Sequence, residues 1–501
     1  MVHTRWASLD APRAPSKLHR DAYPQGGEVD YREGAMYLKK LTIKHLKCFD
    51  SLEIDFPGKN GDYSGWIVLL GGNGTGKSTL LQAMALALLG DVATRELLTP
   101  RGYVRQGADR ALVDAEIVKG TADSAEGKPR KSPYTPQFAI IGETEVELLD
   151  QLFTAPQVVL LNQKQDRNGL LRGPYDAKKA GWFSCGYGPF RRLSGGVEDS
   201  ALTHSPGRDA RMASLFRESV ALTRWERWLT SIYSRANDPS LPEREREKYM
   251  TDLAAVQELV NKLLTGPVQI QTINSKEVLF SAPGGAVVTV PHLSDGYRSF
   301  LALVFDILRH LQESNQGLES VLGHNGKTGA IELNVEGVVL IDEADTHLHP
   351  IWQRRLGRRL REVFPKVQFI VTSHSPFIAQ TASDHGLFVL RQGDAGGPVQ
   401  LSQPEPSIKG WRVEQILLSP LFGLAETRDE ETEKLLATYH ALAAKKVWEA
   451  LSPAEQQELT ALEAQLGERL TGPGDTLEER KRDEAMSQYV DETLARLPKA
   501  G

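Results

Sequence analysis

The clearest succession of apolar and polar segments in the chain begins at residue 66. Residues 66–70 form an apolar run of strand-forming side chains, which predicts a buried β-strand. A glycine-rich turn follows at 71–76, and residues 77–89 then carry apolar side chains at helical spacing up to Gly90, a residue type that commonly ends a helix. The pattern therefore predicts a strand, a tight loop and a helix in direct succession.

Alternating patterns predict further strands and an α/β fold. Leu41 and Ile43, and then Leu52 and Ile54, alternate with polar residues, which indicates a β-hairpin just before the strand at residue 66. The other expected strands are residues 112–118, 138–141, 158–161, 268–273, 278–281, 286–290 and 337–341, and a buried strand that ends at His374. Strands mixed with helices in this way are typical of an α/β domain.

Helical spacing is strongest in the middle and at the end of the chain. Residues 214–264 carry apolar residues three and four apart, which indicates a helical insertion. Ser294 is a suitable N-cap for a second amphipathic helix, whereas residues 312–335 are polar and predict a loop. From about residue 404, three amphipathic segments follow that are separated by Pro or Gly.

These patterns predict three parts. Residues 1–36 mix Pro, Gly and charged residues without periodicity and are expected to be a flexible leader. Residues 37–403 are expected to be the α/β domain, with the helical insertion at about 200–265. Residues 404–501 are expected to be a helical region that carries no recognisable chemistry, and so is a candidate docking platform for another protein.

Composition excludes several classes of protein. A net charge of -6 over 501 residues argues against a generally basic nucleic-acid binder, although a local basic face stays open. Cys48 and Cys185 are the only cysteines, too few for a disulfide framework, which favours a reducing compartment. Because the sequence has neither an apolar run of membrane-spanning length nor the apolar core of a secretion signal, we expect a cytoplasmic protein without a membrane partner.

The turn after the first buried strand carries candidate chemistry. Gly71, Gly76, Lys77 and Ser78 fit the spacing G-x-x-x-x-G-K-S, in which backbone N–H groups converge on phosphate oxygens at a helix N-terminus. Lys77 is expected to hold the β- and γ-phosphates of ATP, and Ser78 to hold Mg²⁺. The expected nucleotide contacts in this segment are Gly71, Gly72, Asn73, Gly74, Thr75, Gly76, Lys77, Ser78 and Thr79.

Two later strand ends would complete a hydrolytic site. Asp342 and Glu343 follow the buried run at 337–341, at the edge where open α/β sheets bind ligands. We expect Asp342 to reach Mg²⁺ through water, and Glu343 to orient and deprotonate the attacking water. His374, at the end of the next buried strand, is expected to bond the γ-phosphate and keep that water in place.

Two segments are candidates for the signature that ATP-binding-cassette proteins place at a helix N-terminus. Residues 193–196 read Leu-Ser-Gly-Gly, but Pro and Gly follow where a helix should run, so we interpret them as an ordered loop near the active site. Ser294 and Gly296 precede an amphipathic helix just upstream of the acidic strand, and are the better candidates.

Other polar clusters have simpler interpretations. His347 and His349 lie two apart without an evident third metal ligand, so a structural or interface role is favoured. The helix at 352–364 carries five arginines, which favour a solvated face over a DNA backbone contact.

Together these motifs resemble the ABC-type ATPase heads of the SMC, RecF and OLD proteins. The likeness covers roughly residues 37–395 and rests on the phosphate loop, on residues 293–298 and 341–345, and on the segment from Ser373 to Pro376 that contains His374. Within that class, residues 186–196 and 411–428 are similar to ATPases of bacterial anti-phage systems, especially the Septu ATPase, which also occurs with some retrons.

The resemblance implies a head-to-head dimer, or a higher even oligomer, that sandwiches two ATP molecules. Ser294 and Gly296 of one chain would then complete the site of the other, while Asp295 departs from the usual second glycine of the signature. Lys47 resembles a basic nucleotide contact of the first hairpin in such heads. Gln106 and Gln157 are the two candidates for the glutamine that couples nucleotide to the two lobes of the head.

The resemblance also implies a separate nuclease. Residues 385–501 show neither a TOPRIM acid set nor a His-Asn-His arrangement, so any nuclease would be another chain, with the His-Asn-His type favoured and the TOPRIM type as the alternative. The leading hypothesis is therefore a defence ATPase whose nucleotide-dependent dimer controls that nuclease; its turnover would depend on Mg²⁺ and could be slow. The alternative is a DNA repair or maintenance ATPase of the RecF or SMC kind that clamps duplex DNA; the large insertions weaken a third option, an ABC transporter ATPase.

Overall fold

The computed structural model describes most of the chain between residues 36 and 470. The described residues are 36–56, 64–118, 120, 133–142, 146–148, 151–153, 156–162, 182–191, 207–218, 220, 222, 225–264, 266–383, 385–393, 397–405, 407–424 and 426–470. They form two compact units, one that extends to Val413 and one that begins at Glu414. The expected leader and the loop at 193–196 lie outside the described residues.

A six-stranded sheet forms the centre of the first unit. Its order is β18-β17-β3-β16-β15-β9, and every neighbouring pair is parallel except β17 with the edge strand β18. The strands are β3 (Trp66–Gly71), β9 (Phe183–Tyr187), β15 (Gly337–Ile341), β16 (Val367–Ser373), β17 (Leu387–Arg391) and β18 (Gln400–Ser402). Residues of β15 and β16 are buried along their whole length, as expected for parallel strands that are covered on both faces.

A second sheet is antiparallel and has the order β2-β1-β4-β5-β8. Its strands are β1 (Tyr37–Leu46), β2 (Phe49–Asp55), β4 (Arg110–Val118), β5 (Gln137–Ile141) and β8 (Gln157–Leu160). The hairpin and the three strands expected from the alternating pattern are thus confirmed.

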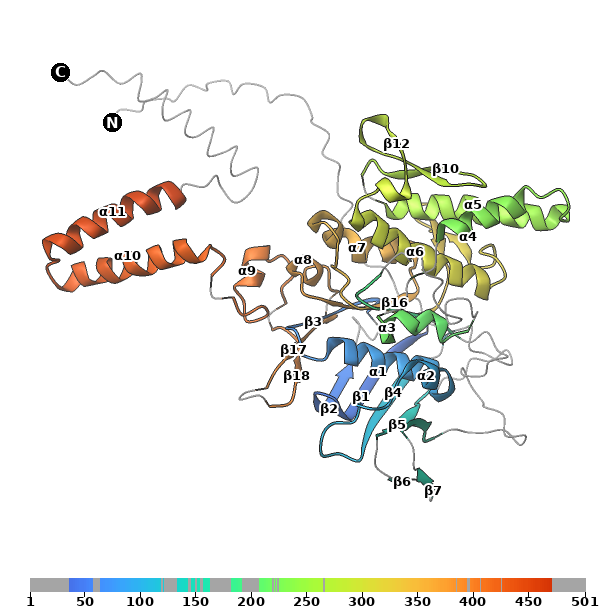
Figure 1. The fold of residues 1–501 in the computed structure, drawn as a ribbon, viewed down its shortest axis with the longest axis horizontal. Helices are drawn as coiled ribbons and strands as arrows, with labels where there is room; N and C mark the ends of the chain where they lie inside the picture. The colour runs from blue at the N-terminus through green and yellow to red at the C-terminus, as the bar shows by residue number, and fades with distance from the viewer. Residues whose placement is uncertain are drawn as a thin grey trace, which may run out of the picture. The chain divides into compact units, whose positions relative to one another are not determined.

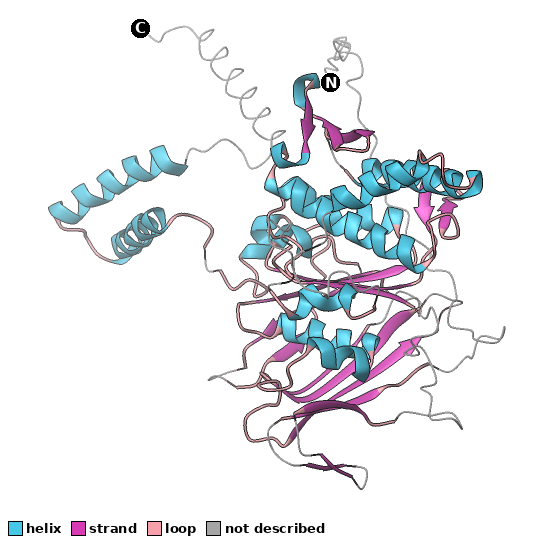
Figure 2. Cartoon of the chain, turned by 45° about the vertical axis from the view of Figure 1, so that its right-hand side comes forward, coloured by secondary structure: helices cyan, strands magenta, loops and turns pink. Residues whose placement is uncertain are grey.

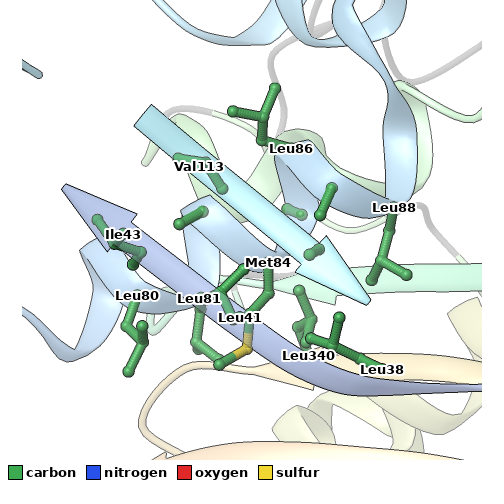
Figure 3. Close-up of a cluster of buried hydrophobic side chains, with 14 of the residues drawn as sticks. Leu38, Leu41, Ile43, Leu80, Leu81, Met84, Leu86, Leu88, Val113 and Leu340 are labelled. Atoms are coloured by element: carbon green, nitrogen blue, oxygen red, sulfur yellow. The ribbon is translucent and has the colours of Figure 1, made fainter. Parts of the chain in front are cut away.

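Helix α1 (Lys77–Leu89) lies between the two sheets and forms the main hydrophobic core with them (Figure 1). Leu81 and Met84 of this helix pack among Leu41 of β1, Val113 of β4 and Leu340 of β15, all completely buried (Figure 3). Burial of such a side chain contributes roughly 1.5–3 kcal/mol. Because both faces of α1 are apolar, the helix fixes the loop at its N-terminus against both sheets.

Three helices pack on the other face of the parallel sheet, namely α6 (Asp295–Ser314), α7 (Pro350–Val363) and α8 (Pro376–Ala379) (Figures 1 and 2). Helices α4 (Trp225–Ala236) and α5 (Glu243–Leu263) pack on α6 and α7, while α2 (Asp91–Leu97) and α3 (Ala213–Phe216) lie near α1. Trp225 of α4 stacks on Phe305 of α6 with ring centroids 4.1 Å apart, and both side chains are buried in the core. The helical insertion is confirmed as α3, α4 and α5.

Small β-hairpins complete the first unit. One sheet consists of β10 (Gln269–Ile273), β11 (Val278–Ser281) and β12 (Val287–Thr289), as the alternating pattern predicted, and another of β6 (Val146–Leu148) and β7 (Gln151–Phe153). The prediction of a loop throughout 312–335 is wrong, because β13 (Leu322–His324) pairs with β14 (Ile331–Leu333) there. These strands have only three residues each, so their alternation is too short to stand out among polar neighbours.

The second unit is helical. Its described helices are α9 (Val413–Leu417), which begins at the last residue of the first unit, α10 (Glu430–Trp448) and α11 (Pro453–Leu470). Asp429 caps α10, since its side chain accepts a hydrogen bond from the Thr432 N–H, and Arg469 of α11 bonds Glu431 of α10. Within the described part of the chain, no helix is long and apolar enough to cross a membrane.

Candidate nucleotide-binding site

Four neighbouring strands of the parallel sheet end at the same edge, and each is followed by residues that carry chemistry. β3 leads into the glycine-rich loop, β16 ends before His374, β15 ends before Asp342 and Glu343, and β9 is followed by residues 188–191. Ligands of open α/β sheets bind at this carboxyl edge. The topology therefore brings together three motifs that are far apart in the sequence.

The loop between β3 and α1 depends on glycine at specific positions. Gly74 and Gly76 have φ angles of 77° and 86°, in the left-handed region where a side chain is strained. A Cβ at Gly76 would also lie 2.4 Å from the Cys48 Sγ, and one at Gly71 would lie 2.8 Å from the Leu390 carbonyl oxygen. The loop is thus tightly packed at both ends. It leads directly into the N-terminus of α1, where backbone N–H groups can bind phosphate oxygens.

Lys77 is held inside this loop. Its Nζ donates hydrogen bonds of 2.9 Å to the Gly71 and Gly72 carbonyl oxygens, and the side chain is buried. Burial lowers the pKa of Lys77, while the charges of Asp342, Glu343 and Asp345 act in the opposite direction. A buried ammonium surrounded by loop backbone at a helix N-terminus fits a phosphate chain.

Asp342 and Glu343 are fixed by Thr372 of the adjacent strand. The Thr372 hydroxyl donates to Asp342 Oδ1 at 2.5 Å and accepts the backbone N–H of Glu343 at 2.7 Å. The carboxylate of Glu343 accepts a 3.0 Å hydrogen bond from Thr346. Asp342 is buried, and together with the exposed Ser78 hydroxyl it offers the oxygen ligands that Mg²⁺ prefers.

His374 lies within electrostatic reach of these groups. Partial burial lowers the pKa of His374, and the positive charge of Lys77 lowers it further, against the opposing charges of Asp345, Glu343 and Asp342. A lowered pKa favours the neutral imidazole at neutral pH, which can accept one hydrogen bond and donate another. The backbone N–H of His374 is bonded to Asp345 Oδ1 at 3.3 Å.

Arg191 is a site residue that no local sequence pattern singles out. This buried residue lies four positions after the end of β9, and its guanidinium donates to the Asp342 carbonyl oxygen at 3.1 Å and to the Glu343 carbonyl oxygen at 2.8 Å. Burial lowers the pKa of Arg191 to about 10, against the charges of nearby carboxylates, so the side chain stays charged at neutral pH. The local signal in the sequence was weak: an arginine that follows a short run of small and aromatic residues.

The first hairpin reaches the same loop. Lys47 occupies its turn with a φ of 48°, and the Nζ lies 3.7 Å from the centroid of the Tyr103 ring. Burial lowers the pKa of Lys47. Gln106 lies exposed in a turn before β4, and Gln157 lies in β8, so neither follows a strand of the parallel sheet.

Residues Ser294 and Gly296 lie at the start of α6. Ser294 occupies the N-cap position, but its side chain makes no capping hydrogen bond and is exposed, so the expected hydroxyl cap is absent. A Cβ at Gly296 would lie 2.7 Å from the His347 carbonyl oxygen, which shows how closely α6 approaches the loop after the acidic pair. His349 caps α7 by accepting the Ile351 N–H, which confirms its structural role.

A phosphate loop, an acidic strand end and a histidine at one edge of a parallel sheet define a P-loop ATPase of the ABC type, with a helical insertion and a helical C-terminal region. The chain belongs to the protein family described as "AAA domain, putative AbiEii toxin, Type IV TA system", whose model matches residues 67–379. That match includes the phosphate loop, the acidic pair and His374.

Relatives in curated collections come from bacterial systems. The chain is 26% identical to the Septu protein PtuA of Bacillus mycoides (strain KBAB4) over 95% of its own length and 57% of the relative. It is 34% identical to the Retron Ec83 probable ATPase of Escherichia coli, over 31% of this chain and 26% of the relative. The chain thus spans little more than half of the first relative, and these likenesses confirm the resemblance to ATPases of the Septu and retron kind.

Solved structures that are similar to the chain at low identity include the following two. The SMC head domain from Thermotoga maritima is 16% identical, covers 74% of this chain and 99% of its own, and gives a TM-score of 0.38. The recombination mediator protein RecF with ATPrS is 12% identical, covers 74% of this chain and 100% of its own, and gives a TM-score of 0.37.

Proposed function

We propose that this protein is the ATP-binding and ATP-hydrolysing subunit of an anti-phage defence complex, in which its nucleotide-dependent dimer controls a separate nuclease. The main support for ATP hydrolysis is that four side chains with suitable chemistry meet at one edge of the parallel sheet. They are Lys77, Asp342, Glu343 and His374. The names of the relatives, Septu protein PtuA and retron probable ATPases, support the defence context.

Each residue has a defined task in this proposal. The loop N–H groups and Lys77 bind the phosphates of ATP, and the Lys77 ammonium exchanges its two carbonyl partners for phosphate oxygens. Ser78 would hold Mg²⁺ directly and Asp342 would hold it through water, and the ion would neutralise phosphate charge. Glu343 accepts the proton of the attacking water, and neutral His374 orients that water against the γ-phosphate.

The proposed dimer explains the exposed start of α6. Ser294 and Asp295 are exposed in the single chain, although Gly296 is packed closely against the loop that follows the acidic pair. An exposed helix N-terminus at this place can complete the site of a second copy, because the first N–H groups of a helix have no partner within the helix and attract phosphate. Lys47, in the turn of the first hairpin, remains a proposed nucleotide contact.

The second unit is the proposed docking platform for the nuclease, for which the His-Asn-His type is favoured over the TOPRIM type. Val447 and Trp448, at the end of α10, are 72% and 87% exposed. Large aromatic side chains at such positions commonly anchor protein interfaces.

Co-purification tests the proposal. The chain would be purified with the product of the neighbouring gene, and the mass of the assembly measured with and without ATP. We expect a stoichiometric nuclease on an even number of ATPase chains, lost in the double variant Val447→Ser/Trp448→Ser and kept in Val287→Ser, a matched exposed residue of the first unit at 51% exposure. A bare ATPase in every preparation would contradict the partner proposal.

The alternative function is a RecF- or SMC-like ATPase that clamps duplex DNA. The specific observation in its favour is the arginine-rich α7, where Arg354 is exposed. Against it, Arg359 is bonded to Glu362 at 3.1 Å and Arg361 Nε donates to the Gly357 carbonyl oxygen, so these charges are partly used within the helix. An ATP-dependent dimer that retains duplex DNA without a nuclease would favour this alternative.

A further inference from the structure

The turn that carries Glu343 has an unusual backbone. The β15 ladder ends at Ile341, and Glu343 has a φ of 47°, in the left-handed region that non-glycine residues rarely occupy. Residues keep such a conformation only where their surroundings impose it, and they cluster at functional sites. The direction of the Glu343 side chain therefore depends on whatever holds this turn.

Two residues hold the turn from opposite sides. Thr372 accepts the N–H of Glu343 through its hydroxyl, and its carbonyl oxygen accepts the N–H of Ala344 at 2.9 Å. Arg191 binds the backbone carbonyl groups of the turn: one terminal nitrogen donates to the Asp342 carbonyl oxygen and the other to the Glu343 carbonyl oxygen. The planar fork of an arginine suits two acceptors at fixed separation, which a lysine ammonium does not match.

Arg191 is itself supported by a rigid strand. Tyr187, the last residue of β9, donates its hydroxyl to Asp306 Oδ2 on α6 at 3.1 Å. Asp306 is buried and also contacts Arg309 and His310 of the same helix, both at 3.2 Å. The strand that leads to Arg191 is thus tied to the helix that begins with the signature residues.

We propose that Arg191 is a positioning residue for ATP hydrolysis: by holding the carbonyls of Asp342 and Glu343, it fixes the turn that directs the Glu343 carboxylate at the attacking water. Arg191 acts through Glu343 and not on ATP, because its side chain is buried and its two terminal nitrogens are bonded to carbonyl oxygens. The inference rests on the proposed ATPase function.

The test uses the full-length chain and the variants Arg191→Gln, Arg191→Lys, Glu343→Gln and Arg191→Gln/Glu343→Gln. The control is Arg95→Gln, since Arg95 also donates to a backbone carbonyl, that of Val158, but away from the acidic turn. Turnover is measured by phosphate release, and binding by the fluorescence of trinitrophenyl-ATP. Unfolding midpoints in urea are recorded for every variant.

For Arg191→Gln we expect kcat to fall roughly tenfold to a hundredfold, the range expected when a reacting group is misplaced, with the affinity for trinitrophenyl-ATP unchanged within about twofold. Arg191→Lys should recover part of the turnover, and Arg95→Gln all of it. In the Glu343→Gln background, Arg191→Gln should cause no further loss, because the group that it positions is already disabled.

Three results would overturn the inference: wild-type turnover in Arg191→Gln, a loss of affinity equal to the loss of turnover, or an undiminished effect in the Glu343→Gln background. If Arg191→Gln does not fold, Arg191→Lys is judged by the same criteria. Absence of ATP hydrolysis by the wild-type chain would instead contradict the proposed function, so the two failures are distinguishable.

Discussion

The Thr372 hydroxyl donates a 2.5 Å hydrogen bond to Asp342 Oδ1 across the neighbouring strands β16 and β15. Both side chains are buried, so neither has water as a substitute partner. One threonine therefore orients the carboxylate that is proposed to hold Mg²⁺, while it also fixes the backbone of Glu343.

Replacement of Thr372 by valine should disable this arrangement at nearly constant volume. Leaving a buried carboxylate oxygen without its donor costs about 1–3 kcal/mol, more for a charged group, so we expect ATP turnover to fall roughly tenfold or more. Thr372→Ser keeps the hydroxyl and should keep most of the turnover. Equal activity of the valine and serine variants in a phosphate-release assay would show that the hydrogen bond is unimportant.

Two glycines of the phosphate loop should respond differently to alanine. A Cβ at Gly76 would meet Cys48 and Phe49 within 3 Å, whereas one at Gly74 meets nothing within 4 Å, although both residues have positive φ. Gly74→Ala should cost only about 1 kcal/mol of backbone strain, and Gly76→Ala clearly more, because of the added clash. Urea denaturation measures both, and indistinguishable midpoints would contradict the packing described around Gly76.

A second pair of glycines tests the contact of α7 with the sheet. Gly357 lies in α7, where a Cβ would be 2.5 Å from the Trp66 indole, whereas Gly467 in α11 has no atom within 4 Å of that position. Alanine is favoured over glycine in helices by about 1 kcal/mol, so Gly467→Ala should stabilise the second unit. Gly357→Ala should destabilise the first unit by about 1–3 kcal/mol through overpacking. Calorimetry that shows stabilisation in both variants would refute the close packing of α7 on β3.

The Asp306 cluster should make stability depend on pH in the acid range. Burial acts to raise the pKa of Asp306, but the charges and hydrogen bonds of His310 and Arg309 outweigh it and lower the pKa from 3.8 to about 2. Because the folded pKa lies below the unfolded one, the stabilisation is complete above about pH 4 and is lost as pH falls towards about 2. Tyr187 and Cys185 of β9 face the same carboxylate.

The variant Asp306→Asn measures this contribution. The wild-type advantage in unfolding free energy should be largest at pH 5 and above and should shrink as pH falls towards about 2.5. Glu247→Gln, on the exposed surface of α5, controls for the loss of one carboxylate. An advantage that stays constant, or grows, on acidification would show that the Asp306 charge is not stabilised by its neighbours.

The sequence predicted the parts of the site that are contiguous along the chain. The phosphate loop and the pair Asp342 and Glu343 each combine a buried strand with adjacent polar residues, so local pattern was sufficient to find them. Arg191 could not be found in this way, because its role depends on two carbonyl oxygens, 151 and 152 residues away in the sequence, that only strand pairing brings near.

Strand β9 is one of the strands that the sequence pattern did not predict. Residues 183–187 read Phe-Ser-Cys-Gly-Tyr, which has neither the alternation of an exposed strand nor the branched apolar side chains of a buried one. Their strand character comes from pairing with β15, where Gly186 lies opposite Leu340. A Cβ at Gly186 would meet Met212 at 2.4 Å, so tertiary packing rather than local propensity selects glycine there.

The most direct test of the ATPase assignment compares the wild-type chain with Glu343→Gln in two assays, phosphate release from ATP and equilibrium binding of ATP. We expect the wild type to hydrolyse ATP and Glu343→Gln to bind it with similar affinity, while turnover falls by about 10²–10⁴, the usual contribution of a general base. Equal turnover of the two proteins, or no binding of ATP by either, would contradict the site described at the carboxyl edge of the parallel sheet.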